Sequence, residues 1–248
     1  MTDERQNMKK GDTRRIQLIE TAERLFYTNG YEKTSVQDIL DEMHFSKGGF
    51  YHHFDSKLSL LEAICETRAA ETCEAARVWL DREDFAAAEK LNGVFREGTL
   101  WHSGNAGFVS LLIGVAYRED GALMREKMKA CQLNGMQDIM EKLLTEGQKS
   151  GEFTVTDVPA TAQMLLRLYM QFTDEIAFLL AAEDDVSRLG EALTRKLWVY
   201  RGAIERILIA PFGSIILFEA DDLLRLGLQI VQDRIRREAG LVQMRINL

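Results

Sequence analysis

Residues 34–57 read TSVQDILDEMHFSKGGFYHHFDSK and predict two short helices joined by a tight turn, followed by the start of a third helix. The first short helix begins near Thr34, where Thr34–Gln37 fits a capping box with the last side chain reaching back. The turn is placed at His44-Phe45, and Ser46 is expected to cap the second short helix, which runs through Phe54. The stretch therefore predicts a helix-turn-helix.

An amphipathic helix precedes this stretch, from about Asp12 to Thr28, with Asp12 or Thr13 as its cap. Asn29-Gly30 ends it, because glycine readily adopts the left-handed conformation found after a helix. Its apolar face is expected to pack against the helix-turn-helix and consists of Ile16, Ile19, Ala22, Leu25 and Phe26.

The second short helix carries an unusual set of side chains over about two turns: Lys47, Gly48, Gly49, Tyr51, His52 and His53. Lysine and tyrosine can reach phosphates, histidines can donate to base edges or phosphates, and glycine lets two backbones approach closely. A plain three-helix core explains Phe45, Phe50 and Phe54. It does not explain two adjacent glycines, because each costs about 1 kcal/mol relative to alanine inside a helix. This helix is expected to enter the major groove of double-stranded DNA.

The whole chain is predicted to be all-α. It has 248 residues, of which 46% are hydrophobic, with only two prolines, so a large folded core is expected. Apolar residues recur every three to four positions, and the alternation typical of strands is almost absent.

Charge is distributed unevenly along the chain, whose net charge is −8. Residues 1–60 hold nine Lys/Arg and ten Asp/Glu, whereas residues 61–248 carry a net charge of −7. Residues 5–15 hold five Lys/Arg and one acidic residue. A basic N-terminal arm beside the predicted reading helix can bind phosphates locally, with strong salt dependence, while the rest stays acidic.

Arg14 to Ile64 resembles the DNA-binding domain of the TetR family of bacterial transcriptional regulators. The residues that carry the resemblance are Ala22, Leu25, Phe26, Gly30-Tyr31, Thr34-Ser35-Val36, Ile39 and the run Phe45–Lys57. The chain departs from the family pattern at His44, where a glycine is usual, and at Leu40, where a small residue is commoner. Position 44 is expected to have positive φ, which histidine tolerates better than most residues.

The resemblance implies a role for each residue of the motif. Thr34 and Lys57 would bind phosphates at two edges of the helix-turn-helix, and Tyr51 would donate to a third phosphate. His52 would occupy the variable position next to the bases, while His53 either binds phosphate or supports the helix. The groove-facing set would be Ser46, Lys47, Gly48, Gly49, Tyr51 and His52.

The resemblance also implies two domains, a DNA-binding domain over 1–57 and a helical effector-binding and dimerisation domain over 58–248. Further helices are predicted near 56–80, 84–101, 105–118, 121–148, 159–182, 187–209 and 219–237. The helices at 159–182 and 187–209 are the candidates for a dimer interface. Their apolar stripes are Leu165, Leu168, Phe172, Ile176 and Leu179, and Leu189, Leu193, Leu197, Tyr200, Ile204 and Leu208. An intrachain core would show the same stripes.

An effector pocket for a small apolar or amphipathic molecule is expected among the aromatic and methionine residues of the middle helices. Its candidate lining is Trp101, Phe108, Tyr117, Met128, Phe172 and Glu175. The apolar residues among them are better explained as core than as the lining of a pocket. Glu175 lies on an apolar stripe and is open to three interpretations: a pair across the dimer, a counter-ion for a cationic ligand, or a surface side chain.

No catalytic or metal-binding constellation accompanies these motifs, so neither an enzyme nor a cofactor or metal site is predicted. The three cysteines lack a CxxC and are expected to be free thiols, with redox sensing as the alternative. Without a signal peptide or an apolar run long enough to span a bilayer, a soluble cytoplasmic protein is expected.

Two functions therefore compete. The first is an effector-responsive repressor that binds a palindromic operator as a homodimer. The alternative is a TetR-fold DNA-binding protein without a small effector, controlled by a protein partner or acting on the nucleoid. A pocket of several hundred Å³ in the C-terminal domain would separate them.

Overall fold

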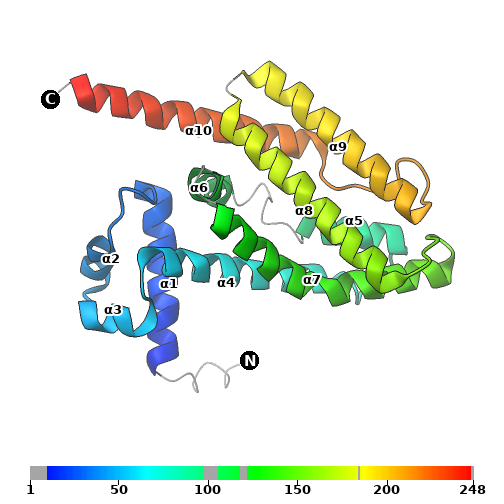
Figure 1. Ribbon diagram of the computed structural model, residues 1–248, viewed down its shortest axis with the longest axis horizontal. Helices are drawn as coiled ribbons and strands as arrows, with labels where there is room; N and C mark the ends of the chain where they lie inside the picture. Colours follow the sequence, from blue (N-terminus) through cyan, green and yellow to red (C-terminus); the bar gives the residue numbers. More distant parts are fainter. Residues whose placement is uncertain (1–9, 98–105, 118–121, 184, 247–248) are drawn as a thin grey trace. The chain divides into compact units, whose positions relative to one another are not determined.

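The computed structural model describes residues 10–97, 106–117, 122–183 and 185–246 (Figure 1). These residues form helices and contain no strand, which confirms the all-α prediction. No described helix is long and apolar enough to span a membrane. The chain divides into two compact units, Met1–Arg68 and Ala69–Leu248. The division falls inside α4 (Lys57–Arg77) and not at its start, where the sequence placed it.

The N-terminal unit contains α1 (Lys10–Asn29), α2 (Val36–Met43), α3 (Lys47–His53) and the beginning of α4. Gly30 follows α1 with φ +87° and donates to the carbonyl of Phe26, as expected for a glycine that ends a helix. Ile16 was expected in the apolar face of α1, but its side chain is 41% exposed. The core consists of Leu18, Ile19, Ala22, Leu25, Phe26, Ile39, Leu40, Phe50, Phe54, Leu60, Leu61 and Ile64.

In the part of the C-terminal unit that the structure describes, the rest of α4 is followed by α5 (Ala87–Glu97), α6 (Ala106–Ala116), α7 (Ala122–Ser150), α8 (Val158–Ala182), α9 (Val186–Leu208) and α10 (Ala220–Ile246). α7 packs along α8, α8 along α9, and α10 along α9, while α5 packs against α7. Asp157 and Asp185 cap α8 and α9 by accepting hydrogen bonds from backbone N–H groups of the first turn. These short, capped connections make consecutive long helices antiparallel neighbours.

The apolar stripes proposed for the dimer interface lie mainly inside the unit. All six stripe residues of α9 are buried within the chain, as are Leu165, Phe172 and Ile176 of α8. Other apolar side chains face outward: Met164 is 47% and Phe178 45% exposed. A repeat of 3.6 residues identifies a buried face but not whether its partner is the same chain or another one.

Candidate functional site

The start of α2 is fixed by a capping box formed by Ser35 and Asp38. The Asp38 N–H donates to Ser35 Oγ (3.1 Å), and the Ser35 N–H donates to Asp38 Oδ2 (2.7 Å). Hydrogen bonds from the Ser35 backbone and side chain lower the pKa of Asp38. The predicted box was therefore displaced by one residue, and Gln37 instead donates to Asp41 (2.7 Å).

His44 makes the turn between α2 and α3. Its backbone is left-handed, with φ 49° and ψ 46°, which confirms the prediction of a positive φ at this position. The His44 N–H donates to the carbonyl of Asp41 (3.2 Å), and the Phe45 N–H donates to that of Leu40 (2.9 Å). These bonds close α2 and set the direction in which α3 leaves the turn.

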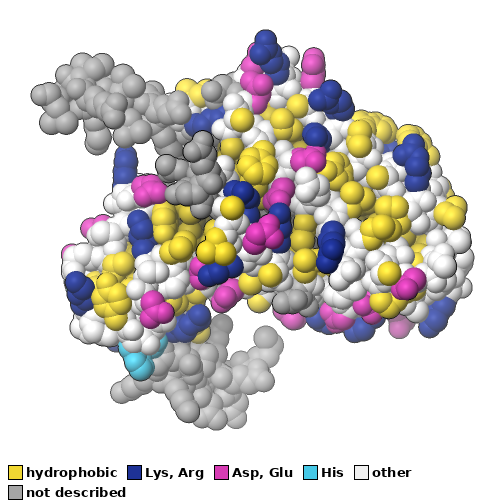
Figure 2. Space-filling model, viewed as in Figure 1, with side chains coloured by type: hydrophobic (Ala, Val, Ile, Leu, Met, Phe, Trp, Pro, Cys, Tyr) yellow, Lys and Arg dark blue, Asp and Glu magenta, His cyan; other side chains and the backbone are white. Residues whose placement is uncertain are grey.

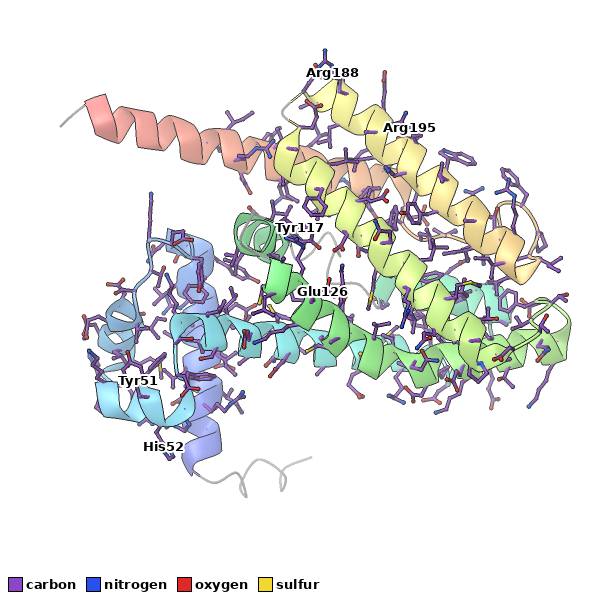
Figure 3. The ribbon with its side chains drawn as sticks, in the orientation of Figure 1. Tyr51, His52, Tyr117, Glu126, Arg188 and Arg195 are labelled. Carbon is purple, nitrogen blue, oxygen red and sulfur yellow. The ribbon has the colours of Figure 1, made fainter. Side chains whose placement is uncertain are left out.

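α3 separates an internal face from an outward face. Ser46 caps it by accepting from the Gly49 N–H (3.1 Å), as predicted. Phe50 and Phe54 are buried, while Tyr51 is 49% exposed and His52 is also exposed. Figure 3 shows Tyr51 and His52 on α3, and Figure 2 shows histidine at the surface of this unit. The helical repeat groups Lys47, Gly48, Tyr51 and His52 on one side, which contains no carboxylate of α3.

Glycine occurs at two positions of α3 for different structural reasons. A Cβ built on Gly48 would meet no atom within 4 Å. A Cβ on Gly49 would lie 2.5 Å from Cζ of the Phe45 ring. Close packing of Phe45 thus accounts for Gly49 without any ligand, and only Gly48 remains free for the approach of another molecule's backbone.

Thr34 and Lys57 are directed into the protein, contrary to the phosphate contacts that the family resemblance implied. The Thr34 side chain is fully buried, and its hydroxyl points to the carbonyl oxygens of Gly30 (2.9 Å) and Leu25 (3.3 Å). Lys57 Nζ donates to the carbonyls of Tyr31 (2.8 Å) and Thr34 (3.1 Å), and lies 4.1 Å from the centre of the Tyr31 ring. Both side chains therefore join the end of α1 to the starts of α2 and α4.

Two arginines outside the predicted residue set lie on aromatic rings of the helix-turn-helix. The Arg14 guanidinium is 5.7 Å from the centre of the Phe45 ring, and that of Arg15 is 5.2 Å from the Phe54 ring. They keep their charge beside α3. The basic run at 5–15 is the sequence signal that points to them. His53 is half-buried with its ring 5.1 Å from that of His52, which leaves its two expected roles open.

The expected effector-pocket residues that the structure describes take part in polar contacts or lie in the core. Trp101 lies outside the described residues, and Phe108 lies in α6 but its side chain is likewise outside them. The Tyr117 hydroxyl donates to Asp174 Oδ1 (2.7 Å), while Met128 and Phe172 are buried in the core.

Glu175 forms an intrachain cluster between α8 and α9. Its carboxylate pairs with Lys196 and accepts hydrogen bonds from Tyr200 (2.7 Å) and Gln171 (3.1 Å). Partial burial would raise the pKa of Glu175, but these hydrogen bonds outweigh burial and hold the pKa below its usual range. Lys196 of the same chain therefore supplies the positive partner that the sequence left unidentified.

A methionine-rich cavity lies between α5, α7 and α8, but its volume is only ≈ 20 Å³. That is room for about one water molecule, far below the several hundred Å³ expected for an effector. It is lined by Val94, Phe95, Gln132, Met136, Met140, Leu166, Tyr169, Met170 and Thr173. A larger hollow of ≈ 550 Å³ beside α9 and α10 is an open surface groove.

Sequence comparison places the helix-turn-helix among known regulators. Residues 18–64 match the family model described as bacterial regulatory proteins, tetR family. The uncharacterized HTH-type transcriptional regulator YerO of Bacillus subtilis is 47% identical over 49 residues, which cover 20% of this chain and 17% of YerO. The fatty acid metabolism regulator protein of B. subtilis is 25% identical over 159 residues, or 64% of this chain and 80% of the relative.

Solved structures share the fold over most of the chain. A TetR-family transcriptional regulator from Pectobacterium atrosepticum superposes with a TM-score of 0.58 at 22% identity, over 81% of this chain and 97% of the other. FadR from B. subtilis, solved with stearoyl-CoA, gives a TM-score of 0.51 at 20% identity, over 88% and 95%. The helix-turn-helix at 18–64 is therefore that of the TetR family of bacterial transcriptional regulators, and the chain as a whole shares its fold with solved structures of TetR-family regulators.

Proposed function

We propose that the protein represses transcription by binding a palindromic operator as a homodimer, and that a small apolar or amphipathic effector releases it. The observation that carries DNA recognition is the outward face of α3. There Lys47, Gly48, Tyr51 and His52 lie together on a helix that has no carboxylate of its own, and Arg14 and Arg15 lie on rings of the same helix-turn-helix. Cations and a tyrosine hydroxyl suit phosphates, and an exposed imidazole suits a base edge.

Dimerisation is supported by the apolar side chains that α8 and α9 leave outside the core. Met164 on α8 is 47% exposed, and Val199 on α9 is 61% exposed. Two copies of α3 must lie about 34–36 Å apart to read successive major grooves, which one chain cannot do alone. The outward faces of α8 and α9, and not the buried stripes, are the proposed interface.

The effector is proposed to bind at the methionine-rich cavity. Met136, Met140 and Met170 have unbranched side chains that can change rotamer and enlarge the ≈ 20 Å³ space. Gln132 and Tyr169 supply polar groups to orient a ligand. The FadR structure shows that a protein of similar fold holds stearoyl-CoA. α4 spans both units of the chain and is the proposed route by which a change in the C-terminal unit reaches α3.

The small size of this cavity favours a second candidate function, a DNA-binding protein of the same fold without a small effector. Such a protein would be controlled by a protein partner or would act on the nucleoid. An effector screen on the operator complex distinguishes the two functions.

The first test is a footprint of the full-length protein on DNA just upstream of its own coding region, at two salt concentrations. We expect a protected, roughly palindromic site whose affinity falls steeply with salt. Lys47→Ala should weaken binding to all sequences, whereas His52→Ala should change the preference among sequences by about 1–3 kcal/mol at one base pair. Weak, uniform binding without a protected site would count against a specific operator at this position. An equal loss on every sequence in His52→Ala would disprove its base-reading role.

A further inference from the structure

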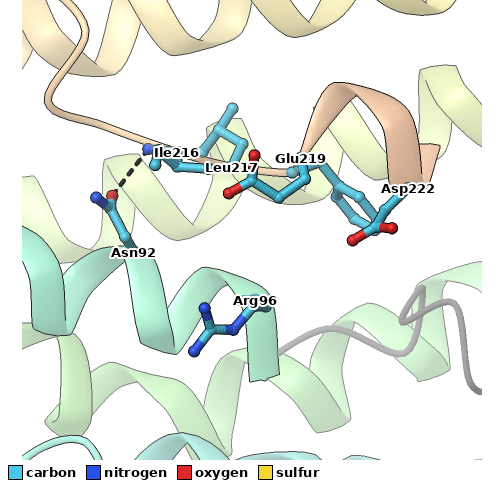
Figure 4. A pocket seen from close by; sticks show the side chains of 7 residues that line it. Asn92, Arg96, Ile216, Leu217, Glu219 and Asp222 are labelled. Atoms are coloured by element: carbon cyan, nitrogen blue, oxygen red, sulfur yellow. Dashed lines mark hydrogen bonds between the residues drawn. The ribbon is translucent and has the colours of Figure 1, made fainter. Parts of the chain in front are cut away.

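A second cavity in the C-terminal unit shares no lining residue with the methionine-rich one. Its volume is ≈ 70 Å³, several times the 10–15 Å³ that one water needs. Asn92 and Arg96 of α5 form one wall, and residues 216–219 with Asp222 form the other (Figure 4). The cavity therefore lies where α5 faces the segment that leads into α10.

The second wall is held in place by the half-buried amide of Asn92 and the buried carboxylate of Glu205. Both halves of the Asn92 side-chain amide are used: Nδ2 donates to the Ser214 carbonyl (2.8 Å), and Oδ1 accepts from the Ile216 N–H (2.8 Å). Glu205 is 3% exposed and accepts from the Gly213 N–H (2.8 Å). Because the backbone of this segment is fixed on both sides, the cavity is preformed.

Opposite charges stand on the two walls without pairing with each other. Arg96 interacts with its neighbour Glu97 (3.3 Å) and with the Trp79 ring (5.1 Å). Asp222 pairs with Arg225 (3.3 Å) at the surface. The Glu219 carboxylate has no hydrogen bond or ion pair with any residue that the structure describes. Exposed pairs such as Arg96–Glu97 contribute at most about 1 kcal/mol, so a ligand can replace them.

We propose that this cavity binds a small zwitterion of the α-amino-acid class with an apolar side chain. Arg96 receives the carboxylate, because a guanidinium matches a carboxylate with two parallel hydrogen bonds. Glu219 receives the ammonium group, with Asp222 adding negative charge. The apolar part of the ligand lies against Ile216 and Phe218. A molecule with only one charge would leave one wall unmatched.

Binding would join α5 to the start of α10, since the two charged ends of the ligand contact different walls. A ligand that binds only the folded state raises the melting temperature of the protein. The site does not depend on the proposed repressor function, because its test measures ligand binding without DNA.

The test is isothermal titration calorimetry and thermal melting of the full-length protein with L-alanine, L-valine, L-leucine, L-methionine and L-phenylalanine. Isoamylamine and 4-methylpentanoate are the control ligands. Each keeps the side chain of leucine but only one of its charges, the ammonium group in the first and the carboxylate in the second. We expect at least one amino acid to bind and to raise the melting temperature, and both single-charge analogues to bind at least about tenfold more weakly than leucine.

Two variants and one control complete the experiment. Arg96→Gln and Glu219→Gln should each weaken amino-acid binding by about tenfold or more, since each removes a charged partner of the ligand. Arg236→Gln, on α10 but outside the cavity lining and paired with Asp233 (3.9 Å), should leave binding unchanged. The proposal is overturned if none of the five amino acids binds at millimolar concentration, if isoamylamine binds as well as leucine, or if both cavity variants bind like the parent protein.

Discussion

The cations beside α3 and the cations in the interior of the C-terminal unit are used differently. Beside α3, Arg14 and Arg15 lie on aromatic rings, which hold the guanidinium groups without neutralising them. In the C-terminal unit, buried or half-buried cations are paired with carboxylates: Lys90 with Glu146 (2.5 Å), Lys129 with Asp174 (2.5 Å) and Arg201 with Glu205 (3.3 Å). The first arrangement leaves charge available for a polyanion, and the second uses charge to hold helices together.

This difference shows that residue type alone does not reveal what a charge does. Lys57 illustrates this within the N-terminal unit. Its ammonium group donates hydrogen bonds to two backbone carbonyls and does not belong to the outward face of α3. Substitutions that remove an internal partner should cost folding stability. Substitutions on the outward face of α3 should cost DNA affinity alone.

The largest effect on stability is expected at Asp174, which is 7% exposed and accepts the hydroxyl of Tyr117 while it pairs with Lys129. Asp174→Ala removes the acceptor of both groups in a poorly solvated place and should lower the free energy of unfolding by about 3 kcal/mol. Urea denaturation followed by circular dichroism measures it. Glu126→Ala is the matched control, because Glu126 also contacts Lys129 (3.2 Å) but its side chain is 72% exposed. It should cost less than about 1 kcal/mol. Equal losses in both variants would contradict the role of burial.

The two glycines of α3 give the next effect. Gly49→Ala places a methyl group against the Phe45 ring and should destabilise the fold by about 1–3 kcal/mol. Gly48→Ala has open space around it in the free protein, so stability should stay the same or rise by up to about 1 kcal/mol. Thermal melting and fluorescence anisotropy with operator DNA measure the pair. If close approach of DNA explains Gly48, the Gly48→Ala variant should bind DNA more weakly although it is well folded. Unchanged affinity would remove that explanation.

Thr34 and Tyr51 separate an internal hydroxyl from an outward one. Thr34→Val removes the buried donor to Gly30 and Leu25 and should cost about 1–2 kcal/mol of stability, with no loss of DNA affinity for the folded protein. Tyr51→Phe should leave the melting temperature unchanged and weaken DNA binding on all sequences. A loss of affinity in fully folded Thr34→Val would restore the phosphate contact that the family resemblance implied.

The smallest effect is a pH dependence in the C-terminal unit. Partial burial would raise the pKa of Glu152, but hydrogen bonds from the Ala88 and Ala87 N–H groups at the start of α5 outweigh it and lower the pKa below the ordinary 4.5. A lowered pKa in the folded state stabilises the fold at pH above 4.5, and this stabilisation is lost as pH falls further. The melting temperatures of the parent protein and of Glu152→Gln should therefore differ at pH 7 and converge as the pH falls to 3. A constant difference across this range would exclude the linkage.

Much of the N-terminal unit could be predicted from local sequence. The Ser46 cap and the burial of Phe50 and Phe54 follow from neighbouring residues, while the left-handed backbone at His44 follows from the family resemblance. The capping box was displaced by one residue because Thr34-Ser35 offers two hydroxyls at consecutive positions. Only the position of Gly30 and Leu25 decides that Thr34 turns inward, which leaves Ser35 as the cap.

The sequence by itself determined which segments are helical and several of their ends, because caps, glycines and the 3.6-residue repeat act over a few neighbouring residues. Only the tertiary structure decided that the stripes of α8 and α9 are core, that Lys196 is the partner of Glu175, and that Gly49 makes room for Phe45. It alone brought Asn92 and Arg96 opposite Glu219 and Asp222. These relations join residues that are distant in the chain or compete for the same space, and no local pattern encodes which pair will meet.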